Sequence, residues 1–411
     1  HAVDLHGEVA ILLAEGNAQR LVAGSPYPHI VHDAQTDGGQ DGIPTGDLSA
    51  GSGVQIIFAA AGAVPVFDVA VGGGGGIDLG HAAQQAARKA GMKIGIVADM
   101  AVGVHPAGSD VWWNPERFAK GATVGAPPDM FNQQGQDWSQ PPLNPIALEQ
   151  TGFRVYRDMV HDMFANAGAV RIDHILGLFR LWWIPEGKPA TDGTYVHYDS
   201  DVMLGILALE ASRAGGVVVG EDLGVVPAYV SKSLSEHGIL GCAVEWFEQM
   251  DGVFRTPKDW RPYALASVNT HDMPPAAGYL EYGHVKLREQ LGLLSGPVEE
   301  FQKSATVEHN AMLNMLVEEG YLDKAALDDE AANENEIIDA LYRGLKGSPC
   351  KLMAASIVDA VGEKRTQNQP GTNNEYPNWR IPLADGEGNV VPLEKLFDEP
   401  RLQEITAIMR G

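Results

Sequence analysis

Three stretches of the chain share one pattern of apolar and polar positions, in which an amphipathic helix, a glycine, a short apolar strand and an acidic residue follow one another. Helical spacing predicts helices over residues 81–90, 154–167 and 204–214, each ending at glycine. Apolar runs predict strands over 93–98, 169–172 and 217–220, which lead into Asp99, Asp173 and Glu221. Apolar strands that alternate with helices are typical of parallel sheets buried on both faces.

Further apolar runs extend this predicted sheet. Residues 242–246 and 264–268 are expected strands, and the second leads into Thr270-His271-Asp272; residues 351–361 fit a strand, although their Ala-rich start fits a helix equally. Polar residues at the carboxyl ends of several strands favour a closed barrel over a doubly wound sheet, because barrel active sites gather there. We therefore expect an α/β fold, a (β/α)8 TIM barrel with inserted loops and helical subdomains, as a single catalytic domain over residues 1–411.

Two segments interrupt the pattern. Residues 103–144 are rich in Gly, Pro, Trp, Gln and Asn, and are expected to form an insertion, either a functional loop or a small subdomain. Residues 284–345 are acidic with helical spacing and are expected to form a solvated helical insertion, with an interaction surface as the alternative. In the tryptophan pairs 112–113 and 182–183, strand-like alternation predicts one buried and one exposed ring.

The first 80 residues fit the pattern poorly. Residues 9–13 suggest the start of a helix, and 54–60 and 64–71 suggest strands or buried segments. The five glycines at 72–76 do not match G-x-G-x-x-G, so we interpret them as a turn and not as a phosphate loop. The chain starts with His1 instead of methionine, so we expect it to be a fragment.

The amino-acid composition limits the classes of molecule that the chain is expected to bind. With 29 basic and 54 acidic residues, the net charge of −25 disfavours nucleic acid and anionic membranes, but it does not oppose a neutral sugar. Two cysteines in 411 residues fit a reducing compartment and lead us to expect a cytoplasmic protein. The sequence contains no long apolar run and no apolar signal sequence at its start.

Acidic residues at three predicted strand ends carry the candidate chemistry. Arg171 and Asp173 lie on one face of a strand, where the guanidinium keeps the carboxylate ionised, as a nucleophile requires; a structural Arg–Asp pair is the alternative. A partly desolvated Glu221 facing other carboxylates has a raised pKa and suits a general acid, whereas its neighbour Asp222 better fits a turn cap. Asp272 suits binding of sugar hydroxyls and stabilisation of positive charge, with His271 as a further donor, although a lone His-Asp pair is more often structural.

Other chemistries lack their motifs. No H-E-x-x-H, C-x-x-C or similar ligand spacing is present, so we expect no catalytic metal and no cofactor, and no G-x-S-x-G marks a serine hydrolase. For glycoside cleavage, carboxyls about 5–5.5 Å apart would retain the anomeric configuration and carboxyls about 6.5–9.5 Å apart would invert it. The sequence leaves this choice open.

An ordered set of strings resembles the 4-α-glucanotransferases, the amylomaltases or disproportionating enzymes of glycoside hydrolase family 77. The strings are GAPPD at 125–129, NQQGQDW at 132–138, RIDH at 171–174, GEDLG at 220–224, THD at 270–272, QPGT at 369–372 and EYPNWR at 375–380. The match runs from about residue 80 to about residue 395.

This resemblance implies a retaining mechanism on a (β/α)8 barrel, with maltooligosaccharides or starch-type glucans as substrates. The family's nucleophile falls on Asp173, its general acid/base on Glu221 and its transition-state stabiliser on Asp272. Substrate contacts are expected at Arg171, His271, Asp129, Trp138 and His174, and residues 125–138 resemble the family's loop over the cleft. The family supplies its first two barrel strands before residue 93, in the part that matches poorly here.

Two other functions remain open at this point. An α-glucan hydrolase of the α-amylase type shares the logic of three carboxylates, but the 125–138 and 370–380 strings favour the transferase. A non-catalytic glucan-binding barrel is the third hypothesis, and the intact set of Asp173, Glu221 and Asp272 argues against it.

Overall fold

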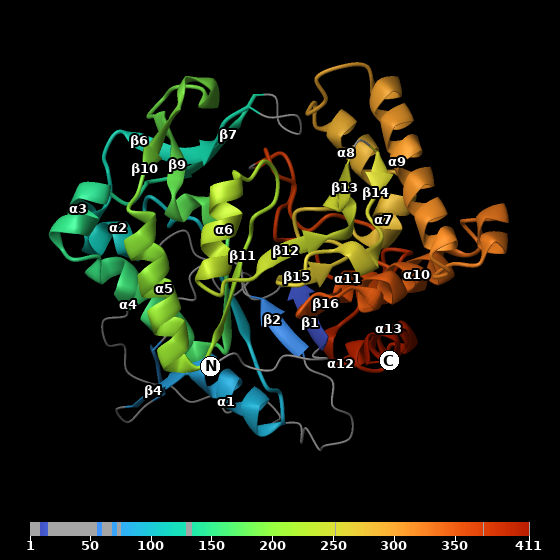
Figure 1. Ribbon diagram of the computed structural model, residues 1–411, viewed down its shortest axis with the longest axis horizontal. Helices are drawn as coiled ribbons and strands as arrows, with labels where there is room; N and C mark the ends of the chain where they lie inside the picture. Colours follow the sequence, from blue (N-terminus) through green and yellow to red (C-terminus); the bar gives the residue numbers. More distant parts are fainter. Residues whose placement is uncertain are drawn as a thin grey trace, which may run out of the picture.

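The computed structural model in Figure 1 describes residues 80–128, 134–250, 252–372 and 374–410, together with the backbone of 9–14, 56–59, 68–71 and 75–79. The fold is α/β, with parallel strands at its centre and helices around them. Asp129, one of the expected substrate contacts, lies outside the described residues.

Eight strands form two parallel sheets. The larger sheet has the order β12-β15-β16-β1-β2, with β12 (Gly241–Val244), β15 (Ala264–Ser267), β16 (Leu352–Ser356), β1 (Val9–Ala14) and β2 (Ile56–Ala59). The smaller sheet has the order β11-β8-β5, with β11 (Val217–Gly220), β8 (Ala169–Ile172) and β5 (Val97–Met100). Both sheets run parallel throughout, as the sequence predicts.

The two sheets meet along both of their edges. On one side, Gly220 N donates to Leu240 O at 2.7 Å and Leu240 N donates to Val218 O at 3.0 Å, which links β11 to the residue that precedes β12. On the other side, β2 and β5 contact each other without a ladder between their described parts. Figure 1 shows β11, β12, β15, β16, β1 and β2 gathered in the middle of the molecule, with helices around them.

The order of helix, glycine and strand is confirmed in all three places, but the first strand, β5 (Val97–Met100), begins four residues later than the expected 93–98 and contains Asp99 instead of leading into it. The helices α1 (Leu79–Lys89), α4 (Arg154–Asn166) and α5 (Ser200–Ala214) precede β5, β8 and β11. Gly215 ends α5 with φ 62°, a left-handed conformation that glycine adopts without strain. Gly168 serves another purpose, because a Cβ at this position would collide with the carbonyl oxygen of Ile94. The glycines therefore mark the same boundary for two different physical reasons.

Several local expectations need correction. Residues 9–13 do not begin a helix. They belong to β1 (Val9–Ala14), whose polar backbone groups pair with a parallel strand on each side. The expected strand over 351–361 ends at Ser356, where α11 (Ile357–Val361) begins. The expected strand over 242–246 ends at Val244, before the 3-10 turn Glu245–Phe247.

Segments near the glycine run are strands. The expected strands at 54–60 and 64–71 contain β2 (Ile56–Ala59) and β3 (Asp68–Val71). β3 pairs antiparallel with β4 (Gly75–Asp78), so part of the glycine run belongs to a strand.

A four-stranded antiparallel sheet stands beside the central strands. Its order is β10-β9-β6-β7, with β10 (Thr194–His197), β9 (Arg180–Pro185), β6 (Ala122–Ala126) and β7 (Gln136–Gln140). Two of these strands come from the expected insertion at 103–144, and the other two come from a segment for which we expected no strand. The insertion also contains α2 (Ser109–Trp113) and is followed by α3 (Pro145–Gln150).

The tryptophan pairs do not follow the expected alternation. Trp112 and Trp113 are 72% and 71% exposed, because they lie on the short helix α2 and not on a strand. Trp182 and Trp183 lie on β9, and both are partly buried.

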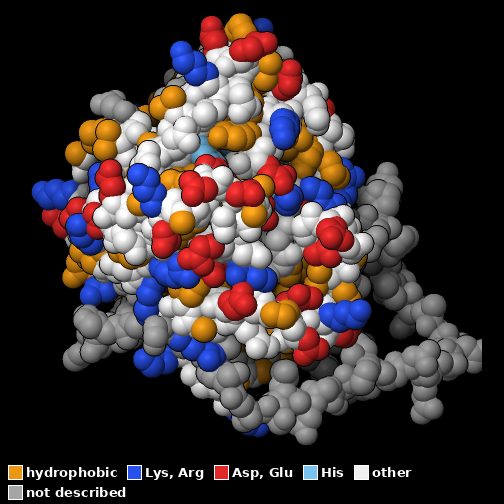
Figure 2. All heavy atoms as spheres, turned by 90° about the vertical axis from the view of Figure 1, so that its right-hand side faces the viewer, with side chains coloured by type: hydrophobic (Ala, Val, Ile, Leu, Met, Phe, Trp, Pro, Cys, Tyr) orange, Lys and Arg blue, Asp and Glu red, His pale blue; other side chains and the backbone are white. Residues whose placement is uncertain are grey.

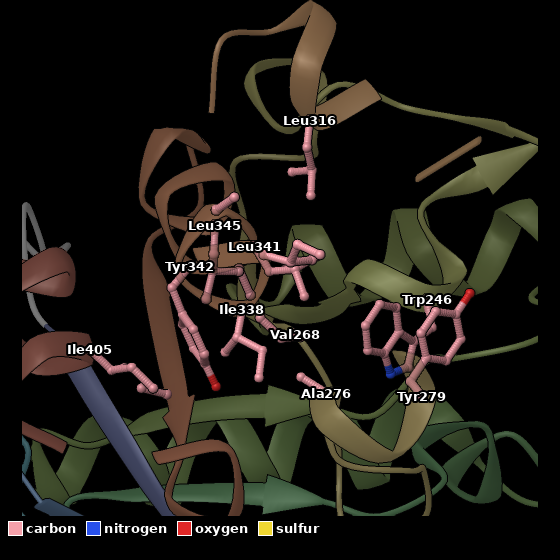
Figure 3. Close-up of a cluster of buried hydrophobic side chains, with 14 of the residues drawn as sticks. Trp246, Val268, Ala276, Tyr279, Leu316, Ile338, Leu341, Tyr342, Leu345 and Ile405 are labelled. Atoms are coloured by element: carbon pink, nitrogen blue, oxygen red, sulfur yellow. The ribbon is translucent and has the colours of Figure 1, made fainter. Parts of the chain in front are cut away.

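Helices predominate in the C-terminal half. They are α6 (Ala228–Glu236), α7 (Ala276–Leu280), α8 (Gly283–Gln290), α9 (Val298–Glu318), α10 (Glu334–Gly347), α12 (Leu393–Leu396) and α13 (Pro400–Arg410), with a small hairpin of β13 (Gln249–Met250) and β14 (Val253–Phe254). The helices expected over 284–345 are present, but they are not simply solvated. α10 buries seven residues, and Figure 3 shows its side chains gathered in one cluster with those of α9, α13 and the end of β15.

The surface carries mixed charge. In Figure 2, acidic and basic side chains are interspersed with apolar ones on the face that includes α8 and α9. Within the described part of the chain, we find no helix long and apolar enough to cross a membrane.

Candidate active site

A buried arginine joins two carboxylates at the ends of β5 and β8. Arg171 Nη1 donates to both carboxyl oxygens of Asp99, at 2.7 and 2.8 Å, and to Asp173 Oδ1 at 3.1 Å. Burial alone would lower the pKa of Arg171, but the carboxylates of Asp99 and Asp173 raise it well above its ordinary value. The expected pairing of Arg171 with Asp173 is present, and a permanent cation lies beside a carboxylate that remains 36% exposed to an incoming ligand.

Glu221 directly follows β11 and is held by backbone donors. Its Oε2 accepts from His174 N at 2.9 Å, and its Oε1 accepts from Leu223 N at 2.7 Å. Burial raises the pKa of Glu221 to about 7; the charge of Asp173 acts in the same direction, and Arg171 and the two backbone donors oppose it. Glu221 is therefore a carboxyl group that holds or releases its proton near neutral pH, as a general acid/base requires.

The conformation of His174 directs one of these donors. His174 has φ 46°, in the left-handed region that non-glycine residues seldom adopt. The 3-10 turn Ile175–Leu178 follows, and Ile175 N donates to the carbonyl oxygen of Glu221 at 2.9 Å. The turn after β8 therefore binds both the backbone and the side chain of Glu221, which fixes the carboxyl relative to Asp173.

Asp272 follows β15 and is held in its ionised form. Its Oδ1 accepts from Asn368 Nδ2 at 2.6 Å, and its Oδ2 lies 3.2 Å from His271 Nε2. Burial would raise the pKa of Asp272, but the charge and hydrogen bond of His271, the hydrogen bond of Asn368 and the charge of Arg171 lower it to about 2. Burial likewise opposes the charge on His271, and Asp272 nevertheless raises its pKa. Each member of the pair thus favours the charged form of the other.

A buried polar hub anchors the segment that carries His271 and Asp272. Asp359 accepts hydrogen bonds from Asn269 Nδ2 at 2.8 and 3.0 Å, from Ala276 N at 2.7 Å and from Tyr342 Oη at 2.7 Å. Asn269 and Ala276 flank the pair on either side. The loop between them is therefore attached at both ends to α10 and α11.

The three carboxylates share one electrostatic centre. The positive charge of Arg171 acts on Asp173, Glu221 and Asp272. Since such interactions weaken quickly with distance, the ends of β8, β11 and β15 bring these side chains together. A carboxyl with a pKa of about 7 and a carboxylate whose pKa is lowered to about 2, around a common cation, form a division suited to acid/base work and charge stabilisation on a neutral substrate.

Trp138 reaches this centre through His174. The two rings meet edge to face, with centroids 5.4 Å apart. Trp138 comes from β7, donates from Nε1 to Gln136 Oε1 at 3.3 Å and also packs against the core beneath α4 and α5. Burial and the charge of Arg180 keep the pKa of His174 low despite Asp173. The contact places Trp138, an expected substrate contact, beside His174, which follows the candidate nucleophile Asp173 in the sequence.

The part of the chain that carries these residues matches a known protein family. Glycoside hydrolase family 77, described as 4-alpha-glucanotransferase, matches residues 80–386. The chain belongs to this family. It is 51% identical over 334 residues to a 4-alpha-glucanotransferase of Mycobacterium tuberculosis (strain H37Rv), covering 80% of this chain and 46% of that protein. It is 36% identical over 325 residues to the Haemophilus influenzae protein of the same name, covering 78% and 46%.

Two solved structures are similar to the fold. An amylomaltase from Corynebacterium glutamicum gives a TM-score of 0.77 at 41% identity, covering 81% of this chain and 48% of that chain. An amylomaltase from Streptococcus agalactiae, solved in complex with acarbose, gives 0.59 at 19% identity over 79% and 58% of the two chains, a likeness that shows the fold alone. The chain spans about half the length of the curated relatives it matches.

Two residues of the site, Asp99 and Asn368, were not predicted from the sequence. Asp99 was recognised as a strand end but not as the partner of Arg171, and Asn368 lies one residue before a recognised string. The signal for Asp99 was that its strand, like the next two, leads into an acid.

Asp222 differs from Glu221 in its contacts. It forms two hydrogen bonds of 2.6 Å with the guanidinium of Arg261 and accepts from Cys242 N at 2.9 Å. Asp222 is thus a buried structural carboxylate that binds the neighbouring strands, and not a turn cap as expected.

Proposed function

We propose that this chain carries the catalytic centre of a 4-α-glucanotransferase, which moves α-1,4-glucan segments between maltooligosaccharides or starch-type glucans. One observation carries the proposal: Glu221, with a pKa of about 7, lies with the pair of His271 and Asp272 and with Asp173 around the charge of Arg171. Family membership supports the activity and the neutral glucan substrate.

Membership of the family supports a double displacement. Asp173 attacks the anomeric carbon while Glu221 gives its proton to the leaving glycosidic oxygen, so a glycosyl ester forms and a shortened glucan departs. Glu221, now ionised, takes the proton from the 4-hydroxyl of a second glucan, which attacks the ester and releases Asp173. Asp272 and Arg171 interact electrostatically with the charges that develop in the transition states of these two steps. His271, His174, Trp138 and Asp129 are proposed substrate contacts.

We further infer that the parallel strands form one closed (β/α)8 barrel. The pairing of β1 with β16, the link from β11 to β12 and the contact between β2 and β5 give each of the eight parallel strands a neighbour on both sides. The similarity to an amylomaltase structure at 41% identity supports closure. In this arrangement the 103–144 segment and the helices over 284–345 are insertions into a single catalytic domain over 1–411. The cytoplasmic location stays a prediction.

Incubation with maltotriose tests the proposed activity. Transfer produces glucose together with maltooligosaccharides longer than maltotriose, and the Asp173→Ala variant should produce neither. Products that are only shorter than maltotriose would favour the hydrolase instead. Chromatography that separates the products by chain length distinguishes the two outcomes.

A further inference from the structure

The segment 366–380 is attached directly to the His271–Asp272 pair. Asn368 N donates to the carbonyl oxygen of His271 at 3.0 Å, and Asn368 Nδ2 donates to Asp272 Oδ1 at 2.6 Å. A single residue, 96 positions away in the sequence, therefore binds both the backbone of the first member of the pair and the side chain of the second.

Asp272 has a partner on each of its oxygens. Asn368 occupies Oδ1, and His271 Nε2 lies 3.2 Å from Oδ2. Two donors on opposite oxygens set the plane of the carboxylate, and each oxygen keeps a further lone pair for a ligand. The orientation of Asp272 thus depends on both neighbours.

Trp379 packs against the other member of the pair. Its ring centroid lies 4.8 Å from that of His271, at an interplanar angle of 47°. The backbone of Trp379 has φ 60°, a conformation unusual for a bulky residue, and its N donates to Gln367 O at 3.0 Å. Strained backbone of this kind persists only when the surrounding structure holds it, and it is concentrated at functional sites.

The segment is braced by its own hydrogen bonds. Gln369 N donates to Asn378 Oδ1 at 2.8 Å, and Asn378 Nδ2 donates to Thr372 Oγ1 at 2.9 Å. Tyr376 Oη donates to Thr366 O at 2.7 Å. These bonds connect the two limbs of the segment and leave Asn368 and Trp379 on the side that contacts the pair.

We propose that Asn368 and Trp379 are positioning residues, which hold the carboxylate of Asp272 and the imidazole of His271 in the orientation that the transferase reaction needs. The proposal rests on the proposed function. Asn368 acts through a direct hydrogen bond to Asp272, and Trp379 acts through packing on His271. Neither residue needs to contact the glucan for this role.

The role predicts a defined kinetic signature. Removing the Asn368 amide leaves Asp272 free to rotate, and misplacement of a catalytic group by about 1 Å can cost roughly 100-fold in rate. The loss should appear in kcat with KM little changed, because the interaction concerns the transition state more than substrate binding. Loss of a donor to the ionised form also raises the pKa of Asp272.

Four variants of the full chain test this assignment with maltotriose as substrate. We expect Asn368→Ala to lower kcat about 100-fold with KM little changed, and Trp379→Ala to lower kcat while Trp379→Phe, which keeps an aromatic ring, restores most of it. Tyr376→Phe is the matched control, because it removes one hydrogen bond within the same segment without touching the pair. Its kcat and pH profile should stay close to those of the unaltered chain.

Three results would overturn the proposal. A raised KM with unchanged kcat in Asn368→Ala would identify a substrate contact, and a Trp379→Phe variant no more active than Trp379→Ala would separate the ring of Trp379 from His271. An equal loss in Tyr376→Phe would mean that general integrity of the segment is what matters. Thermal melts of all variants identify unfolding, and Trp379→Phe keeps the test open if Asn368→Ala is unstable. If the unaltered chain transfers no glucan, the proposed function fails first, and the two failures remain distinct.

Discussion

At the scale of single residues, the reactivity of the site depends on the proton of Glu221. The first chemical step needs the protonated form, and its pKa is about 7. We therefore predict that kcat/KM falls as the pH rises above about 7, approaching a tenfold loss per pH unit. Initial rates with maltotriose from pH 4 to pH 9 measure this limb. A profile that stays flat up to pH 9 would contradict the assignment of Glu221 as the acid.

Glu245 is a second carboxyl whose proton matters, but for stability. It is fully buried, and neither of its carboxyl oxygens has a hydrogen-bond partner among the described residues. Burial, and next the charge of Glu248, raise its pKa from 4.5 to about 8. The folded protein therefore keeps this proton at pH values where the unfolded chain releases it. The resulting loss of stability develops as the pH rises from about 4.5 to about 8.

Replacement of Glu245 by Gln removes this titration. We predict that, between pH 5 and pH 9, the free energy of unfolding of the unaltered chain falls by roughly 3–4 kcal/mol more than that of Glu245→Gln, since one pKa unit corresponds to about 1.4 kcal/mol. Urea denaturation at both pH values measures the difference. Comparing the same variant at two pH values cancels any fixed cost of the buried amide. Equal pH dependence in the two proteins would refute the buried, protonated state.

At the scale of elements, two glycines at equivalent helix–strand boundaries should respond differently to alanine. At Gly215 nothing lies within 4 Å of an added Cβ, so Gly215→Ala costs only the left-handed strain, about 1–2 kcal/mol. At Gly168 the added Cβ meets the Ile94 carbonyl oxygen, so Gly168→Ala should cost about 3 kcal/mol or more. Chemical denaturation of the two variants checks the order. The packing account is wrong if Gly215→Ala proves the more damaging.

The same elements show what local sequence can predict. The strands β8 and β11 begin and end where their apolar runs do, because burial on both faces and glycine at the preceding boundary are local signals. β9 was missed although residues 181–184 are apolar, because its partner β6 lies more than 50 residues earlier in the sequence. β10 was missed because it carries no continuous apolar run and, among the described strands, pairs only with β9. β1 was misjudged because six apolar residues fit helix and strand equally until the neighbouring strands are known.

At the scale of the whole molecule, the site assembles from contacts that no local pattern encodes. Acids at strand ends predicted Asp173, Glu221 and Asp272, and a parallel sheet brings such ends to one edge. Asp99 and Asn368 meet the site across 72 and 96 residues of sequence. Their partners become visible only when the strands and the 366–380 segment are placed. The family resemblance supplied the roles of the three acids, whereas the distances identify what holds them.

Trapping of the covalent intermediate tests the central claim, that Asp173 is the nucleophile and Glu221 the acid/base. α-Maltotriosyl fluoride needs no acid to lose fluoride, so Glu221→Gln should still form the glycosyl ester but lack the base that transfers it. Mass spectrometry should then find one maltotriosyl group on the peptide that contains Asp173, and none when Asp173→Ala is added. Fluoride release without an adduct, or an adduct on another residue, would contradict the account.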